Sequence, residues 1–346
     1  MDAYLSEKRL PAEWEKQEGA LLAWPHEKTD WLPCLESVER VYGEIAMHIS
    51  RYERLTVVTP DPERVRDKMR RSGADMERVR IFEIETNDTW ARDFGPITVV
   101  ENGKRTILDF AFNGWGLKFP ADLDNRVTRR LWELGTWGDM PLETVGLVLE
   151  GGSIESDGRG TILTTAQCLL SPNRNPHLSR DEIEALLGEL LGADRFLWLE
   201  NGRLAGDDTD SHVDTLARFS PEDTILYTAC DDPDDLHYDS LLAMADELKR
   251  FKTRTGKPYR LIPLPWPSPR HDEAGERIPA TYANFLVLNG AVLVPTYGSD
   301  RDAAAMSAIG KAFPGRRIVG IHCLPLLLQH GSLHCATMQI PEGAPA

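Results

Sequence analysis

The feature that most constrains the fold is a unit of strand, tight turn, strand, helix and strand that recurs four times. Each unit is centred on a short turn, and the four turns are Asn102-Gly103, Asp157-Gly158, Ser220–Asp223 and Asn289-Gly290. Asn-Gly and Asp-Gly between apolar runs are strong signals for a β-hairpin. Successive turns are about 55 to 70 residues apart, and a long regular period is typical of radial or stacked architectures.

A fifth unit is divided between the two ends of the sequence. Its first strand is expected over 334–340, and its remaining elements are expected over 19–24, 36–50 and 55–58. A unit completed by both ends closes a ring and leaves no open sheet edge. We therefore predict a single domain over residues 1–346, an α/β fold of five blades, with the fifth blade shared between the N- and C-terminal segments.

Polar residues that could carry chemistry lie at or just before the first strand of every unit. These first strands are expected over 97–100, 153–156, 213–219, 285–288 and 334–340. The polar residues are Asp93, Glu150, His212 with Asp214, Asn284 and Cys335. Equivalent strands of a radial array begin near its axis, so we expect these five segments to converge on one cavity. Because residues two apart share one face of a strand, His212 and Asp214 should point the same way.

The charge and composition of the chain limit the classes of partner that it is expected to bind. The formal net charge of −16 argues against nucleic acid and favours a cationic small molecule. No apolar run is long enough for a membrane span, and the first residues have no basic-then-apolar pattern, so we expect a cytoplasmic protein without membrane contacts. The five cysteines are scattered and odd in number, which argues against disulfides and structural zinc. The oligomeric state stays open, a homo-oligomer included.

Each candidate also has an ordinary structural explanation. Cys335 could be a buried filler, and His212 a structural residue with satisfied hydrogen bonds. Glu150 with its two glycines could be a strand end and flexible turn, while Asp93 could pair with Arg92. A metal is a rival explanation for the acids and the histidine. Neither a His-Glu-x-x-His motif nor an EF-hand loop occurs, so we expect no metal and no cofactor.

Taken together, a thiol, several carboxylates and one imidazole suit attack on a guanidinium carbon. Carboxylates bind the planar N–H groups of a guanidinium and fix its orientation. Cys335 would attack that carbon to form a covalent adduct, while His212 would protonate the departing ammonia and then activate water. A Cys-His protease is an alternative use of the same pair, although it does not need the additional acids.

Five motifs of the chain resemble those of agmatine deiminases, and bacterial peptidyl-arginine deiminases share them. The motifs lie at residues 88–96, 149–154, 164–170 with 173–176, 209–219 and 331–335. The resemblance implies the pentein fold, a five-bladed α/β propeller. It also implies that Cys335 is the amidino-cysteine nucleophile and His212 the general acid/base, with Asp93 and Asp214 holding the guanidinium.

The resemblance further implies a pocket shaped by Glu150 and Trp90. Asp88, Trp115 and Asn284 are additional candidates for substrate binding. The expected reaction converts agmatine and water into N-carbamoylputrescine and ammonia, a step of polyamine metabolism. Deimination of free or peptide-borne arginine is the alternative, and a non-catalytic pentein binding module is a third hypothesis. The chain departs from the family pattern at Gln329-His330-Gly331 and at Met338-Gln339.

Overall fold

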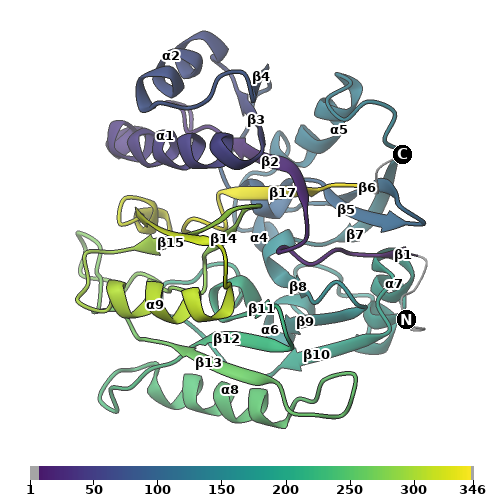
Figure 1. Cartoon of the computed structure of the whole chain (residues 1–346), viewed down its shortest axis with the longest axis vertical. Helices are drawn as coiled ribbons and strands as arrows, with labels where there is room; N and C mark the ends of the chain where they lie inside the picture. Colours follow the sequence, from purple (N-terminus) through teal and green to yellow (C-terminus); the bar gives the residue numbers. More distant parts are fainter. Residues whose placement is uncertain (1–7, 344–346) are drawn as a thin grey trace.

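In the computed structural model, which describes residues 8–343, five small sheets follow one another around the molecule (Figure 1). The first blade contains β5 (Ile97–Glu101), β6 (Lys104–Ala111) and β7 (Leu142–Val148). The second contains β8 (Ile154–Ser156), β9 (Thr161–Thr165) and β10 (Arg195–Leu199). The third contains β11 (Ala217–Ser220), β12 (Thr224–Thr228) and β13 (Arg260–Leu264). The fourth contains β14 (Leu286–Val287), β15 (Ala291–Thr296) and β16 (Arg317–His322).

The same pairing pattern recurs in these four blades. The first strand pairs antiparallel with the second across a hairpin, and the second pairs parallel with the third. A parallel pair requires a crossover connection, which the helical segment of each unit provides. The helices of these connections are α5 (Val127–Glu133), α7 (Arg180–Leu191), α8 (Tyr238–Arg250) and α9 (Asp302–Ala312). The five-bladed α/β fold expected from the repeat is confirmed.

The fifth blade joins the two ends of the described chain. Strand β17 (Thr337–Pro341) pairs antiparallel with β2 (Gln17–Ala23), and Figure 1 shows the two lying side by side. Strand β3 (Arg54–Thr59) follows across helix α1 (Leu35–Tyr52). This blade has a fourth strand, β4 (Val79–Glu83), which follows helix α2 (Pro62–Ser72). Both ends of the chain thus complete one sheet.

Local sequence signals explain where the crossover helices begin and end. Ser179 and Glu182 form a reciprocal capping box at the start of α7, which satisfies two backbone N–H groups. The same helix stops at Gly192, whose left-handed φ of 66° a residue with a side chain rarely adopts. Helix α1 buries Val38, Ile45 and other apolar residues along one face.

One expected strand is wrong in part. The segment expected to be extended over 213–219 begins with a 3-10 turn, η4 (Val213–Thr215), and β11 starts only at Ala217. The turn is closed by Thr215, whose backbone N–H and hydroxyl both donate to the His212 carbonyl. His212 and Asp214 therefore do not share a strand face, and their side chains are placed by this turn.

Helical turns also precede the first strands of the first two blades. These are α3 (Ala91–Phe94) before β5 and η3 (Gly151–Ser153) before β8. The remaining short helical segments are η1 (Leu32–Cys34), α4 (Gly114–Leu117), η2 (Asp124–Arg126), α6 (Ala166–Leu169) and η5 (Leu326–Gln329), and β1 (Lys8–Arg9) pairs with β5. The turns before the first strands lie at the inner ends of the blades, so they form the floor of the central site.

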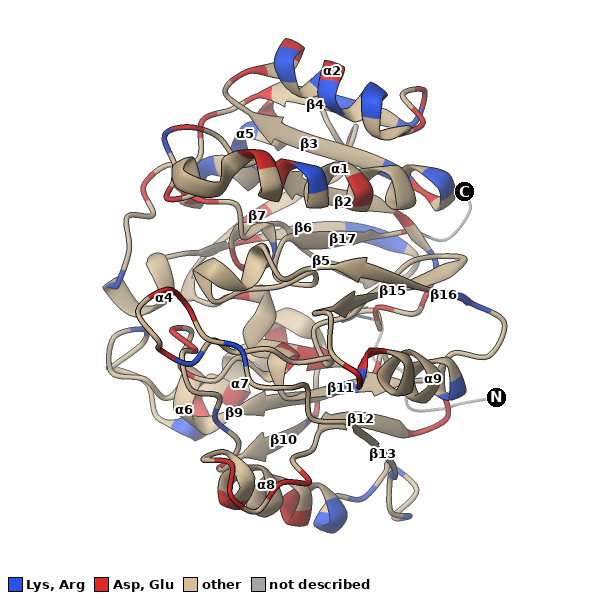
Figure 2. Ribbon diagram, turned by 90° about the vertical axis from the view of Figure 1, so that its left-hand side faces the viewer, with Lys and Arg blue, Asp and Glu red and all other residues tan. Residues whose placement is uncertain are grey.

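Charge is distributed differently on the outside and at the centre. Figure 2 shows blue and red segments interspersed along the outer helices α2 and α8. Near the axis, Arg218 is buried and donates to Glu13 at 2.6 Å and to Glu155 at 2.8 Å. It also donates to the Phe285 carbonyl at 2.8 Å, so one guanidinium joins three parts of the ring. Within the described residues, no helix is long and apolar enough to cross a membrane.

Candidate active site

Three of the expected site residues meet around Gly152, on the turn η3. A Cβ atom at this position would lie 2.6 Å from Nδ1 of His212 and 2.9 Å from Oδ1 of Asp93. It would also lie 3.2 Å from Oδ2 of Asp214. Only glycine leaves room for these three side chains, which come from two other blades.

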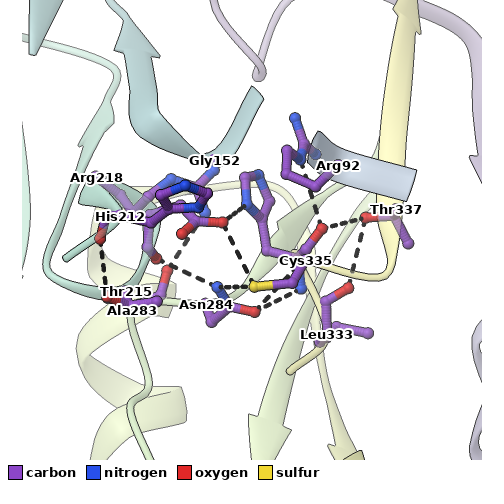
Figure 3. A network of polar contacts seen from close by, with 12 residues as sticks. Arg92, Gly152, His212, Thr215, Arg218, Ala283, Asn284, Leu333, Cys335 and Thr337 are labelled. Carbon is purple, nitrogen blue, oxygen red and sulfur yellow. Dashed lines mark hydrogen bonds and ion pairs between the residues drawn. The ribbon is translucent and has the colours of Figure 1, made fainter. Parts of the chain in front are cut away.

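Asn284 holds Cys335 in place beside this cluster (Figure 3). The Asn284 side chain donates from Nδ2 to the sulfur at 3.1 Å, and its Oδ1 accepts from the Cys335 backbone N–H at 3.2 Å. Oδ2 of Asp214 lies 3.7 Å from the sulfur. The thiol is 6% exposed, so it is reached only through the pocket described below.

The surroundings of Cys335 keep it protonated without a bound cation. Burial raises the pKa of this thiol well above its ordinary value, and the Asp214 and Asp93 carboxylates raise it further. A cation bound between the sulfur and these carboxylates would act in the opposite direction and favour the thiolate. A cationic ligand at this position would therefore favour the thiolate form of Cys335.

Both oxygens of Asp93 have donors. Oδ1 accepts from the Gly152 backbone N–H at 3.0 Å, and Oδ2 accepts from the Trp115 indole at 2.9 Å. Burial raises the pKa of Asp93 to about 6, despite the opposing effects of His212 and Trp115. Asp93 therefore titrates within the range in which an enzyme is readily assayed.

His212 is fully buried between acidic neighbours. Its Nδ1 lies 3.6 Å from Oδ1 of Asp93, and neither ring nitrogen has a hydrogen-bond partner among the described residues. Burial opposes the charged imidazole, but Asp93, Cys168 and Glu150 together raise the pKa of His212 well above its ordinary value. The groups around His212 therefore favour its charged imidazolium form.

Glu150 lies beside His212 and pairs with Arg174. Both Glu150 oxygens accept from Nε of Arg174 at 2.9 Å, and neither side chain is exposed. Arg174 also donates to Asp210 at 2.6 Å and to the Thr209 carbonyl at 2.9 Å. Glu150 thus anchors, through Arg174, the loop that leads to His212.

The potential ligand atoms of Glu150, Cys168 and His212 lie within 4.8 Å of one another. Such a set could attract a soft or borderline metal ion. However, the guanidinium of Arg174 lies against this carboxylate and donates to both Glu150 oxygens. The surroundings also favour the charged form of His212, so both groups oppose a metal cation at this position.

A pocket of about 210 Å³ leads from the surface to Cys335. The indoles of Trp90 and Trp115 form part of its walls. Gly331 lies against Trp90, because a Cβ atom there would be 2.4 Å from the indole. A side chain at position 331 would therefore displace one wall of the pocket.

Acidic residues surround the pocket towards its mouth. They are Asp30, Asp88, Asp207 and Asp208, whereas no lysine or arginine is among the described lining residues. Burial, together with Asp30 and Asp208, raises the pKa of Asp88 to about 7. Neighbouring carboxylates repel one another when they are ionised. A cation that binds among them offsets this repulsion and favours their ionised forms.

The structure brings every sequence-predicted site residue to this pocket or its floor. Asp88, Trp90, Asp93, Trp115 and Cys335 line the pocket, while His212, Asp214, Glu150 and Asn284 surround its inner end. Their chemical roles stay predictions. Sequence reasoning did not single out Arg174, Cys168 or His334, although all three lie in the motifs given above and His334 directly precedes Cys335.

A five-bladed α/β propeller with a thiol, an imidazole and carboxylates at its centre defines the pentein class of proteins. Within that class, the chain belongs to the Porphyromonas-type peptidyl-arginine deiminase family, whose model matches residues 9–341.

Several relatives are similar over almost the whole chain. The agmatine deiminase of Ectopseudomonas mendocina is 34% identical, over 97% of this chain and 96% of the relative. A C. jejuni agmatine deiminase structure with substrate bound is 40% identical, with a TM-score of 0.90 and 97% of each chain covered. A provisionally assigned arginine deiminase from Porphyromonas gingivalis is 51% identical, with a TM-score of 0.92 over 97% of this chain and 99% of that one.

Proposed function

We propose that this protein hydrolyses agmatine to N-carbamoylputrescine and ammonia. The observation that carries the proposal is a pocket with a nucleophilic thiol at its inner end and carboxylates towards its mouth. Agmatine has a guanidinium at one end and an ammonium at the other, so it matches both regions. The net charge of −16 supports a cationic small molecule in preference to nucleic acid. Two relatives that match 97% of this chain are agmatine deiminases.

Binding would place the guanidinium between Asp93 and Asp214, beside the sulfur. Oδ1 of Asp214 is buried and has no hydrogen-bond partner among the described residues, so it is free to accept from a guanidinium N–H. The apolar stem of agmatine would lie between Trp90 and Trp115, and its ammonium would reach Asp88 and Asp208. The two cationic groups of agmatine would thus pair with the carboxylates of the pocket.

The first half of the reaction forms a covalent adduct. The bound cation favours loss of the Cys335 thiol proton to water. The thiolate then forms a carbon–sulfur bond to the guanidinium carbon, as the C=N electron pair moves to nitrogen. His212 donates a proton to one nitrogen, the carbon–nitrogen bond breaks, and ammonia leaves. The product of this half is an amidino group bound to the sulfur.

The second half consumes one water molecule. His212, now neutral, takes a proton from water as the oxygen attacks the amidino carbon. The carbon–sulfur bond then breaks and returns the electron pair to Cys335, and the remaining hydroxyl proton leaves to water as the carbonyl group forms. The sum is agmatine plus water giving N-carbamoylputrescine plus ammonia, with no external oxidant, reductant or metal.

The substrate is tested by measuring ammonia release from agmatine, free arginine and a peptide with a C-terminal arginine. We expect agmatine to have the highest kcat/KM, because the carboxylate of the other two would face the acidic residues at the pocket mouth. Turnover of arginine without turnover of agmatine would refute the proposed substrate and keep the proposed chemistry.

Arginine is the second candidate substrate because a provisionally assigned arginine deiminase is 51% identical to this chain. Neutralising the mouth discriminates between the two substrates. Asp208→Asn should raise KM for agmatine, whose ammonium loses a counter-charge, and should lower KM for arginine if that substrate is used at all. Asp239→Asn, on the outer helix α8, is the matched control.

A further inference from the structure

His334 lies directly behind the proposed site and is 1% exposed. Its Nδ1 is 2.7 Å from Oδ2 of Asp214, and its Nε2 is 2.7 Å from Oε2 of Glu13. The same Asp214 oxygen lies 3.7 Å from the Cys335 sulfur. One imidazole therefore connects a carboxylate of the active site to the N-terminal segment.

The direction of the first contact follows from Asp214. Burial opposes ionisation of this carboxyl group, but its bond with His334 lowers the pKa of Asp214 below the ordinary value. An ionised carboxylate only accepts, so His334 donates from Nδ1. The contact at Nε2 also needs a hydrogen on one of its two atoms. Burial, Arg218 and Arg92 lower the pKa of His334, whereas Glu13 and Asp214 raise it.

Glu13 is itself firmly held. Its Oε2 accepts from Arg218 at 2.6 Å, and its Oε1 accepts from the backbone N–H of Val287 at 2.8 Å. Arg92 approaches the same carboxylate at 4.0 Å. Burial opposes ionisation of Glu13, but Arg218, His334 and Arg92 lower the pKa of Glu13 below its ordinary value.

We propose that His334 is a positioning residue, which fixes the Asp214 carboxylate beside the Cys335 sulfur and is itself held by Glu13. The inference rests on the proposed function in one respect, namely that a guanidinium binds Asp214. His334 fixes Oδ2 of Asp214 and leaves Oδ1 for the substrate. Residues that orient a catalytic or ligating group through a hydrogen bond commonly affect activity by roughly 10–100-fold.

Two substitutions of His334 separate positioning from packing. The amide nitrogen of asparagine lies near the position of Nδ1, whereas that of glutamine lies near the position of Nε2. His334→Asn therefore keeps a donor to Asp214, and His334→Gln loses it. We expect kcat/KM to fall by roughly 10–100-fold in His334→Gln, mainly through kcat, and to stay within a few-fold of wild type in His334→Asn.

The assay uses purified full-length protein, with the fraction of active enzyme determined by alkylation of Cys335. His271→Gln is the control, because that histidine is exposed. Equal activity of the Asn and Gln variants, or higher activity of Gln, would overturn the proposal, since loss of packing would not depend on the position of the donor.

Glu13→Gln tests whether Glu13 holds His334 in place. It also serves as the test of the proposal if neither His334 variant folds. We expect kcat to decrease in this variant with a smaller change in KM, and an unchanged kcat would overturn the role of Glu13. Wild-type turnover of agmatine is measured first. If the wild type uses another guanidine instead, the proposed substrate fails, and the same variants are compared on that guanidine.

Discussion

Among single residues, Cys335 is the one whose loss should separate activity from folding. Its sulfur accepts from Asn284 and packs among buried groups, so Cys335→Ala removes only a small volume. We expect Cys335→Ala to release no ammonia from agmatine and to keep a melting temperature close to that of wild type. Ammonia release and circular dichroism measure the two properties.

The control for this variant is Cys230→Ala, which changes a partly exposed cysteine remote from the pocket. Its activity should equal that of wild type. An active Cys335→Ala enzyme would exclude covalent catalysis through this sulfur.

The acid limb of the pH profile should report Asp93. Burial raises the pKa of Asp93 to about 6, and the neutral carboxyl group present below that pH attracts a guanidinium poorly. We therefore expect kcat/KM to fall as the pH decreases through about 6. Trp115→Phe removes a donor that stabilises the ionised form, so the pKa should rise and the limb should move to higher pH.

The pH dependence of kcat/KM is measured for wild type, Trp115→Phe and the control Trp132→Phe. Trp132 is partly exposed, and its indole donates to the Met140 carbonyl away from the pocket. An acid limb that stays in place in Trp115→Phe would remove Asp93 as the titrating group.

Residue types were predictable from the sequence, but their partners were not. Cys335, His212 and Asp93 could be chosen because a thiol, an imidazole and an acid suggest a common chemistry. Nothing in the local sequence indicates that Glu150 pairs with Arg174, or that His334 contacts Glu13 across 321 positions of the chain. Such contacts depend on the closure of the ring.

At the level of elements, the short turns before the first strands position the site. The period of the repeat predicted the strands and crossover helices well, because apolar patterns and Gly-containing turns are local signals. It did not predict η4, since the turn depends on Thr215 bonding back to His212 in place of continuing a strand. The expectation that His212 and Asp214 share one face of a strand therefore placed them together correctly, although the structure has a turn there.

Gly152 provides a test of these turns. In Gly152→Ala, the methyl group would lie 2.6 Å from Nδ1 of His212, so the histidine or the turn must move. A displacement of about 1 Å can cost on the order of 100-fold in rate. We expect kcat/KM to fall by roughly that factor while circular dichroism shows a folded protein.

Gly146→Ala is the matched control, because a Cβ atom there has no neighbouring atom within 4 Å. Its kcat/KM should match that of wild type. Full activity of Gly152→Ala would mean that the geometry around His212 is not critical.

At the scale of the whole molecule, the buried guanidinium of Arg218 links different blades through its hydrogen bonds to Glu13, Glu155 and the Phe285 carbonyl. Arg218→Met would leave Glu13 and Glu155 without their closest cation, and burial already raises the pKa of Glu155 to about 7. Removal of one partner from a buried ion pair costs about 3–5 kcal/mol. We expect the free energy of unfolding, measured with urea, to decrease by that amount.

The comparison is Arg301→Met, since Arg301 pairs with Asp231 at 3.3 Å on the surface. Its free energy of unfolding should change by at most about 1 kcal/mol. Similar values for both variants would show that the central charges contribute no more than surface pairs.

The pairing of β17 with β2 has a consequence for synthesis on the ribosome. Cys335 and the strand β17, which closes the ring, are synthesised more than 300 positions after Glu13, which contacts His334 at the same centre. A nascent chain that has not yet reached residue 341 has neither the complete fifth sheet nor a firmly placed Cys335. Enzymatic competence should therefore arise abruptly, only once residue 341 has been added, and a stop codon placed between the codons for Cys335 and Ile340 should yield inert protein.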